Sequence, residues 1–286
     1  MKYTITGATG HLGREVVKEL SKLTDSKNIR LAVRSPQKAE DFAKAGYEVM
    51  HSDYYDVPSM VEAFTGTDVL IYIPSITYNV SKRIEEFENS LEAMKEAGVK
   101  HLVDVSFMAD QANNPFQLTG YYAYLPARLA SSKLSYAVVK NSLYADPLVP
   151  YLPELIARGN VIYPVGDQAM SFISRKDSAE AIANVAVRPY LRDKGQIYLL
   201  TQEKNYNMVE LSRIMTEVTG EKIGYQPVSL EEFADIYWAE GDGDELASMY
   251  KAAAMGLMDG VTDDFTRITG HTPQNMKDFL AENYKK

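Results

Sequence analysis

The sequence predicts an α/β fold: a parallel sheet covered by helices on both faces, followed by a smaller, mainly helical C-terminal lobe. Short apolar runs alternate with helical segments about five times, which is typical of parallel sheets. Three glycines spaced three apart separate the first apolar run from the first helical segment. With 286 residues, of which 45% are hydrophobic and 24% charged, the chain can bury a large core.

Six β-rich runs are the expected strands of this sheet. They cover residues 2–6, 29–34, 47–53, 68–75, 101–108 and 135–142. Helical segments follow at residues 14–23, 36–46, 57–66, 80–98 and 121–132. Several of these segments end in a glycine, which tolerates the left-handed backbone that closes a helix.

The glycine loop at residues 6–13 reads TGATGHLG and joins the first strand to the first helix. Gly7 permits a tight turn, Gly10 lets the backbone approach a pyrophosphate, and Gly13 allows close packing of helix on strand. The helix N-terminus then offers free N–H groups to an anion. These glycines can also serve a plain turn, but a strand before them and a helix after them favour a Rossmann-type dinucleotide site. The loop residues Thr9, His11 and Leu12 are also expected to contact the cofactor.

The alternation loosens after about residue 147. A helix at 150–160, a strand at 170–174, a helix at 175–187 and a strand at 195–202 precede mainly helical sequence. We therefore predict an NAD(P)-binding domain at residues 1–146 and a smaller substrate-side lobe at 147–286, partly interleaved with the sheet.

Composition argues against several classes of protein. The net charge of −9 disfavours nucleic-acid binding, and the absence of cysteine excludes disulfides and thiolate chemistry. Four scattered histidines show no metal-ligand spacing, so no metal is expected. The chain opens directly on a strand pattern, without a signal peptide, and no apolar run approaches about 18 residues. We expect a cytoplasmic protein without membrane association.

The motifs TGATGHLG, LAVRSPQKA (31–39), SDYYDVPSMVEAFTGTDVLIYIPS (52–75), EAGVKHLVDVS (96–106) and TGHTPQNMKDFL (269–280) resemble those of atypical short-chain dehydrogenases/reductases. The similarity is to the NmrA-like branch, and in particular to its bacterial NADPH:quinone oxidoreductases. It covers most of the chain, most strongly residues 3–106. The resemblance implies an NADP-binding domain and redox activity toward quinones, although the same branch also contains proteins that only sense dinucleotides.

Cofactor contacts are expected where the sheet strands end. Arg34 ends the second strand, where a guanidinium suits the 2′-phosphate of NADP(H) better than the ribose hydroxyl of NAD. Lys38 is either a second contact or an ordinary helix charge. Asp53 follows the third strand and either accepts from the adenine amino group, as the resemblance implies, or caps the next helix. Further contacts are expected from Ile73, Pro74 and Ser75 after the fourth strand and from Asn141 at the sixth.

No catalytic proton donor is assigned. Carbonyl-reducing short-chain dehydrogenases use a Tyr-xxx-Lys pair on the helix after the fifth strand, and the corresponding segment here offers only Tyr124 with Arg128 around Pro126. We interpret Tyr124 as a packing or pocket-wall residue rather than a proton donor. Three Tyr-xxx-Lys matches lie elsewhere, beginning at Tyr78, Tyr136 and Tyr190.

The acceptor is expected to be a small flat molecule. Its predicted contacts are Tyr78, Phe107, Ser142 and Tyr144, while Ser106 can equally end its strand through backbone contacts. The sequence thus predicts an NADPH-dependent oxidoreductase acting on a quinone or similar acceptor, with an NADP(H)-sensing regulator as the alternative. Epimerase or dehydratase chemistry is disfavoured because the Tyr/Lys pair is missing. The oligomeric state is not defined by the sequence.

Overall fold

The computed structural model describes residues 1–240 and 243–285, and it confirms the predicted doubly wound parallel sheet. Seven strands form the sheet in the order β11-β6-β5-β4-β1-β2-β3. Parallel pairing joins β1 to β2 and β4, β2 to β3, and β4 to β5. The strands are β1 (Tyr3–Thr6), β2 (Ile29–Val33), β3 (Glu48–His51), β4 (Val69–Tyr72), β5 (His101–Phe107), β6 (Ser135–Asn141) and β11 (Gln196–Leu200).

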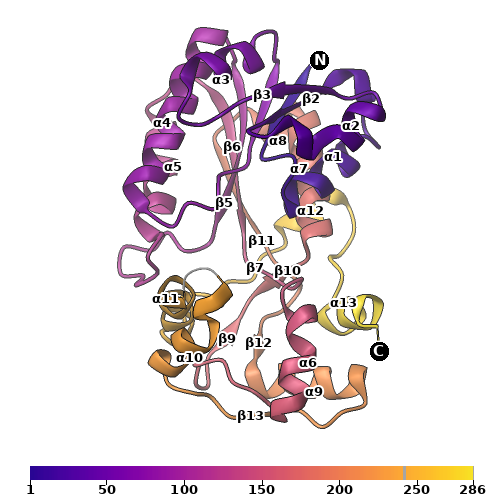
Figure 1. The fold of residues 1–286 in the computed structure, drawn as a ribbon, viewed down its shortest axis with the longest axis vertical. Coiled ribbons are helices and arrows are strands. Elements are labelled where there is room, and N and C mark those ends of the chain that lie inside the picture. Colours follow the sequence, from indigo (N-terminus) through magenta and orange to yellow (C-terminus); the bar gives the residue numbers. More distant parts are fainter. Residues whose placement is uncertain (241–242, 286) are drawn as a thin grey trace. The chain divides into compact units, whose positions relative to one another are not determined.

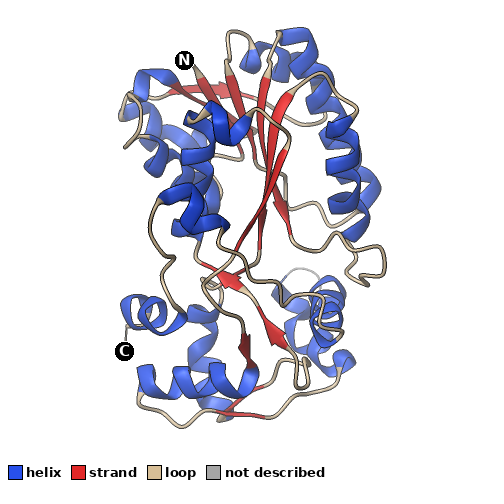
Figure 2. Ribbon diagram, turned by 180° about the vertical axis from the view of Figure 1, so that it is seen from behind, coloured by secondary structure: helices blue, strands red, loops and turns tan. Residues whose placement is uncertain are grey.

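Helices cover both faces of this sheet (Figures 1 and 2). They are α1 (His11–Leu20), α2 (Glu40–Lys44), α3 (Val57–Phe64), α4 (Val80–Ala97), α5 (Thr119–Ala130), α7 (Arg175–Val187) and α8 (Pro189–Arg192), with short 3₁₀ segments at Ser26–Asn28 and Pro36–Ala39. Helices α3, α4 and α5 lie on one face, and α1, α7 and α8 on the other (Figure 1). Because both faces are covered, every residue of β1 and β4 is buried, which explains their continuous apolar character.

Local sequence signals set the helix boundaries next to the sheet. Asp56 begins α3 by accepting a hydrogen bond from the backbone N–H of Ser59, at 3.3 Å. Asn79 caps α4 in the same way through the N–H of Lys82, at 3.0 Å, and α4 ends at Gly98, which has a φ of +74°. These boundaries place the loops at the carboxyl ends of β3 and β4.

Helix α5 continues through Pro126, which lies inside it. Proline fits helical φ but removes one backbone hydrogen bond. Tyr124 and Arg128, on either side of Pro126, both bond to the carboxylate of Glu88 on α4. These side-chain bonds anchor the helix where its backbone ladder is interrupted.

The remaining elements form smaller sheets and a set of helices. They are β7 (Leu143–Tyr144), α6 (Leu148–Arg158), β8 (Asn160–Val161), β9 (Ala169–Met170), β10 (Phe172–Ile173), β12 (Tyr206–Asn207), α9 (Met208–Thr219), β13 (Gly224–Tyr225), α10 (Leu230–Tyr237), α11 (Gly243–Ala254), α12 (Asp264–Thr269) and α13 (Met276–Asn283), with a 3₁₀ segment at Trp238–Glu240. Strand β10 pairs with β7, β12 with β9, and β13 with β8. Buried aromatic rings form part of the core here: Phe233 lies 4.7 Å from both Tyr237 and Tyr250, centroid to centroid.

The single strand expected at residues 170–174 is instead two short strands in different sheets. Ser171 separates them, because its backbone N–H donates to Met258 and its hydroxyl donates to the carbonyl of Gly260, at 2.8 and 2.6 Å. The N–H and hydroxyl of Ser171 are thus engaged by a distant segment where the apolar pattern predicts one continuous strand, while its carbonyl accepts from the N–H of Leu143 on β7, at 3.1 Å.

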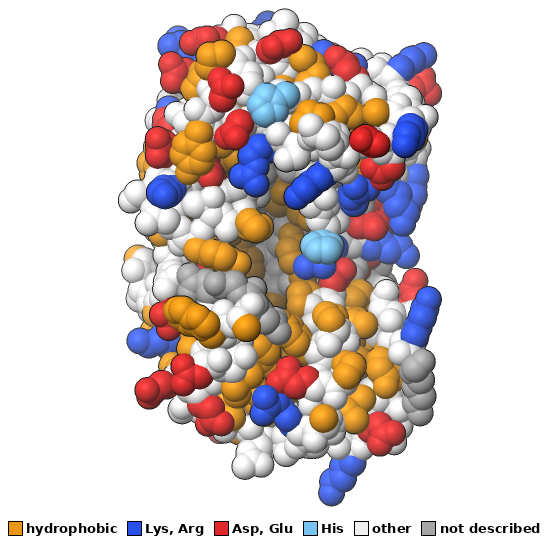
Figure 3. All heavy atoms as spheres, viewed as in Figure 1, with side chains coloured by type: hydrophobic (Ala, Val, Ile, Leu, Met, Phe, Trp, Pro, Cys, Tyr) orange, Lys and Arg blue, Asp and Glu red, His pale blue; other side chains and the backbone are white. Residues whose placement is uncertain are grey.

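The chain divides into two compact units, each built from three segments. One unit contains residues 1–107, 124–140 and 175–198, and the other contains residues 108–123, 141–174 and 199–286. The domain boundary at residues 146/147 stays a prediction. On the face drawn in Figure 3, acidic and basic side chains are interspersed over both units. Among the helices in the described part of the chain, none is long and apolar enough to cross a membrane.

Candidate dinucleotide site

The glycine loop closes tightly between β1 and α1. Gly7 has a φ of +62°, which favours glycine, and its carbonyl accepts a hydrogen bond from the N–H of Gly10, at 3.0 Å. A Cβ at Gly13 would lie 2.2 Å from the oxygen of Gly7, whereas a Cβ at Gly10 would have its nearest neighbour, the same oxygen, at 3.3 Å. Gly13 is therefore required by packing, whereas a Cβ at Gly10 would meet one atom, the Gly7 oxygen, in a much less severe contact.

The N-terminus of α1 faces out of this loop without a competing carboxylate. Gly10 is the N-cap and has no side chain, and the first turn of α1, which is fully described, contains no acidic residue. Leu12 is buried, whereas His11 is exposed. The N–H groups and the positive end of the helix dipole can therefore serve the phosphates of a dinucleotide.

Ile73 joins three loops at the carboxyl end of the sheet. Its N–H donates to the hydroxyl of Thr6 at 2.9 Å, and its carbonyl accepts from the hydroxyl of Tyr54 at 2.7 Å. Gly7 also packs against it, since a Cβ at Gly7 would lie 3.2 Å from the Ile73 Cβ. Burial raises the pKa of Tyr54, so its hydroxyl stays protonated and donates. Sequence reasoning missed Tyr54, although it directly follows Asp53.

A buried charge cluster on α4 fixes the loop after β4. Glu86, with 3% of its surface exposed, accepts from the hydroxyls of Ser75 and Thr77, and the Thr77 bond measures 2.7 Å. Arg83, also buried, donates to the carbonyl of Ser75 at 2.8 Å. Because the Ser75 hydroxyl is engaged with Glu86, any contact that Ser75 makes with a cofactor would come from its backbone. Glu86 and Arg83 were not singled out from the sequence, although charges on the inner face of an amphipathic helix are a recognisable signal.

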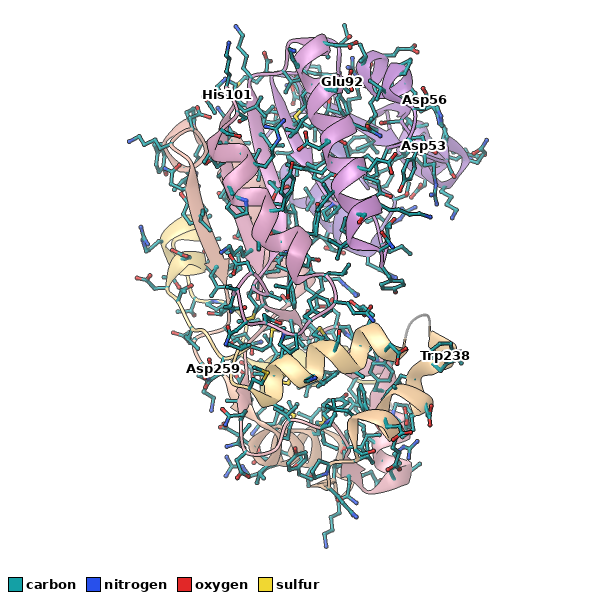
Figure 4. All side chains as sticks on the ribbon, turned by 90° about the vertical axis from the view of Figure 1, so that its left-hand side faces the viewer. Asp53, Asp56, Glu92, His101, Trp238 and Asp259 are labelled. Atoms are coloured by element: carbon teal, nitrogen blue, oxygen red, sulfur yellow. The ribbon has the colours of Figure 1, made fainter. Side chains whose placement is uncertain are left out.

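Asp53 supports its own turn. Its carboxylate accepts from the N–H of Tyr55 at 2.9 Å, and its backbone N–H donates to the hydroxyl of Ser59 at 3.1 Å. Figure 4 shows Asp53 and Asp56 close together at the start of α3. The bond from the Tyr55 N–H to the Asp53 carboxylate is the Asx turn that is common before helices. The predicted contact of Asp53 with adenine stays a prediction.

Arg34 lies exposed directly after β2, at the carboxyl edge of the sheet. Its carbonyl lies 3.1 Å from Nδ1 of His51, the last residue of β3. Lys38, also exposed, is on the following 3₁₀ segment. Arg14 on α1 holds this segment by donating to the carbonyl of Lys38 at 2.9 Å and to the carboxylate of Asp41 at 2.6 Å.

The residues predicted to contact the acceptor, and their neighbour Asn141, differ in how deeply they are buried. Ser142 is fully buried and its hydroxyl donates to the carbonyl of Leu200 at 2.8 Å. Asn141, also buried, donates to the hydroxyl of Tyr144 at 3.0 Å. Phe107 ends β5 and Tyr78 lies exposed before α4. The predicted convergence of these residues on an acceptor stays a prediction.

Tyr124 is hydrogen-bonded to the carboxylate of the Glu88–Arg128 ion pair rather than presented as an acid. Its hydroxyl donates to Glu88 Oε1 at 2.5 Å, and Arg128 binds the same carboxylate through two nitrogens, at 2.7 and 3.0 Å. Burial, followed by the Glu88 carboxylate, raises the pKa of Tyr124. A raised pKa makes the phenol a weaker proton donor. Within the described residues, no group of three or more potential metal ligands comes together.

The fold and the glycine loop define a dinucleotide-binding protein of the doubly wound α/β class. Residues 1–265 match the NmrA-like family. The chain belongs to this family, which is part of the atypical short-chain dehydrogenases/reductases.

Several relatives match over nearly the whole chain. Quinone oxidoreductase 2 of Escherichia coli is 30% identical over 282 residues, which is 97% of this chain and 96% of that protein. The structure of triphenylmethane reductase from Citrobacter, complexed with NADP(H), has a TM-score of 0.91 at 27% identity and covers 99% of this chain and all of that one. A Staphylococcus aureus structure described as a nucleoside-diphosphate-sugar epimerase has a TM-score of 0.93 at 39% identity, with 98% of this chain and all of that one covered.

Proposed function

We propose that this protein is an NADPH-dependent reductase that transfers a hydride to a quinone or a similar flat acceptor. The observation that carries the proposal is the glycine loop between β1 and α1, in a chain similar along nearly its whole length to a quinone oxidoreductase. Packing excludes a side chain at Gly13, and Gly10 presents bare backbone at the N-terminus of α1. A reductase complexed with NADP(H) shares the fold at 27% identity. Arg34 at the end of β2 supports the choice of NADPH.

The state of Tyr124 supports a quinone rather than a carbonyl acceptor. Hydride transfer to a ketone generates an alkoxide, which needs a positioned acid. Tyr124 instead donates to Glu88 and has a raised pKa. Hydride transfer to a quinone gives a phenolate-like anion whose conjugate acid should have a pKa of about 10, as tyrosine does, so water can protonate it. Catalysis then consists mainly of holding nicotinamide and quinone face to face.

Epimerase chemistry, which the description of the S. aureus protein suggests for that protein, is less well supported here. The Tyr-xxx-Lys matches begin at Tyr78 before α4, at Tyr136 on β6 and at Tyr190 on α8. None of the three lies on α5, whose residues are all described. We therefore do not propose nucleotide-sugar epimerisation.

Purified protein is expected to oxidise NADPH when a benzoquinone is added and to act poorly on simple ketones and aldehydes. Tyr124→Phe should keep most of the quinone rate, because the hydroxyl serves a hydrogen bond to Glu88. The decay of NADPH absorbance measures both rates. Ketone reduction that collapses in Tyr124→Phe would overturn the mechanism. Tight NADPH binding without turnover of any quinone would support the sensing alternative instead.

Arg34→Ala is expected to weaken NADPH binding about tenfold to a hundredfold and NADH binding far less. A charge-assisted hydrogen bond to a phosphate contributes roughly 1.5–3 kcal/mol, and NADH lacks this phosphate. Fluorescence titration of the variant with both cofactors measures the difference. Equal losses for NADPH and NADH would mean that Arg34 does not contact the 2′-phosphate.

A further inference from the structure

We propose that His51 is a second residue that recognises the 2′-phosphate of NADPH, and that it makes the preference for NADPH over NADH increase as the pH falls. The inference rests on the proposed use of NADPH. It begins from the place of His51 at the carboxyl edge of the sheet, where strand pairing sets His51 of β3 beside Val33, the last residue of β2. Arg34 is the next residue along the chain, so His51 lies beside the expected phosphate contact.

One hydrogen bond fixes the ring of His51 and its tautomer. Nδ1 lies 3.1 Å from the carbonyl oxygen of Arg34. A carbonyl only accepts, so Nδ1 carries the hydrogen and Nε2 holds the lone pair of the neutral ring. Protonation therefore occurs at Nε2 and leaves the bond to Arg34 in place. The residue is exposed, so Nε2 can gain its proton without carrying a charge into the core.

The acidic side chains on α2 and β3 are each paired with a basic one, so none of them is left to offset the charge of Arg34. On α2, Asp41 is paired with Arg14 at 2.6 Å and Glu40 with Lys44 at 3.7 Å. On β3 itself, Glu48 is paired with Arg30 of β2 at 2.9 Å.

Four further charged groups lie on adjoining segments, and one of them is Asp56, whose carboxylate accepts from the N–H of Ser59 at the start of α3. Lys38 adds a positive charge on the 3₁₀ segment, and Glu62 a negative one on α3. Asp53, two residues after His51, accepts from the N–H of Tyr55. A 2′-phosphate bound at Arg34 would add negative charge beside His51 and favour its protonated form.

Linkage gives the sign of the pH effect. If NADPH binds more tightly to protonated His51, lowering the pH strengthens NADPH binding relative to NADH. Imidazole is the side chain that ordinarily changes charge between pH 5 and 8. The 2′-phosphate itself gains a proton at a pKa of about 6 and is then attracted less strongly to a protonated histidine. The pH effect of His51 should therefore be measured above about pH 6.5.

The test compares wild type with His51→Gln and His51→Lys by titration with NADPH and NADH at several pH values between about 8 and 6.5. Glutamine keeps an N–H that can donate to Arg34 but stays neutral, and lysine stays charged throughout. NADH serves as the internal reference, because it lacks the 2′-phosphate. Wild type should increase its preference for NADPH by about three- to fivefold over this window, the gain expected for one exposed charge pair.

His51→Gln should show a flat, lower preference, and His51→Lys a flat, high one. An equal rise in His51→Gln and wild type would overturn the role of His51 while leaving NADPH use intact. Absence of any NADPH preference in wild type at every pH would overturn the use of NADPH itself, and this inference with it. Thermal unfolding of each variant shows whether the substitution has altered the fold instead.

Discussion

Raising the pH from about 4 to about 8 is expected to destabilise this protein by about 1.4 kcal/mol per pH unit through Asp104 alone. Asp104 lies in the middle of β5 with 0% of its surface exposed, and burial raises the pKa of its carboxyl to about 8. Neither of its oxygens has a hydrogen-bond partner among the described residues. The neutral acid is therefore the form that folding favours.

The sign follows from proton binding in the two states. The folded protein holds the Asp104 proton up to about pH 8, whereas the unfolded chain releases it near pH 4. The stabilisation is fully present below about pH 4 and is lost as the pH rises to about 8, a total of up to about 5 kcal/mol. Above that range it changes no further.

Asp104→Asn isolates this effect, because asparagine is close in shape and does not ionise. Urea unfolding of both proteins between about pH 5 and 9 gives the free energy of unfolding of each. The difference between the two curves should shift in favour of the variant as the pH rises, whatever the offset at low pH. Parallel curves would show that Asp104 titrates normally in the folded protein.

Gly13→Ala and Gly10→Val are expected to separate stability from cofactor binding within one loop. The alanine Cβ at Gly13 would lie 2.2 Å from the oxygen of Gly7, so backbone must move and the free energy of unfolding should fall by about 3 kcal/mol. A Cβ at Gly10 would lie 3.3 Å from the same oxygen, a tight contact that a shift of a few tenths of an ångström relieves, so valine should cost much less stability than alanine at Gly13. Its branched side chain would occupy the space expected for the pyrophosphate and abolish NADPH binding.

Thermal unfolding measures the stability of the two variants, and NADPH titration measures their cofactor binding. The melting temperature should fall strongly in Gly13→Ala, whereas Gly10→Val should lose NADPH binding with a much smaller fall in melting temperature. Unchanged NADPH affinity in Gly10→Val would remove the assignment of the glycine loop to the cofactor.

The sequence predicted the sheet because each strand is an apolar run followed by a helix with its own boundary signal. The glycine loop was equally readable, since Gly7 and Gly13 are demanded by local backbone geometry. The interruption at Ser171 was not, because its partners lie about ninety residues away. The contact of Tyr54 with Ile73 likewise depends on how two loops meet, which periodicity does not encode.

Two buried carboxylates, one of them in the candidate site, could be predicted only in part from the sequence. Asp104 interrupts an apolar strand, and a charge there is either paired or neutral, but only burial and the absence of a partner among the described residues indicate the neutral form. Glu86 occupies the inner face of α4, yet its partners Ser75 and Thr77 come from a loop without periodic structure. Side-chain networks of this kind are set by tertiary contacts.

The division of the chain into interleaved segments has a consequence for synthesis on the ribosome. The sheet-containing unit needs residues 175–198, which bring α7 against α1 and most of β11 alongside β6. A nascent chain that ends before residue 175 therefore leaves the apolar side of α1 uncovered and the outer edge of β6 without its neighbour. Such edges promote pairing between chains. Truncation near the middle of this protein should yield an aggregating fragment rather than a free cofactor-binding domain.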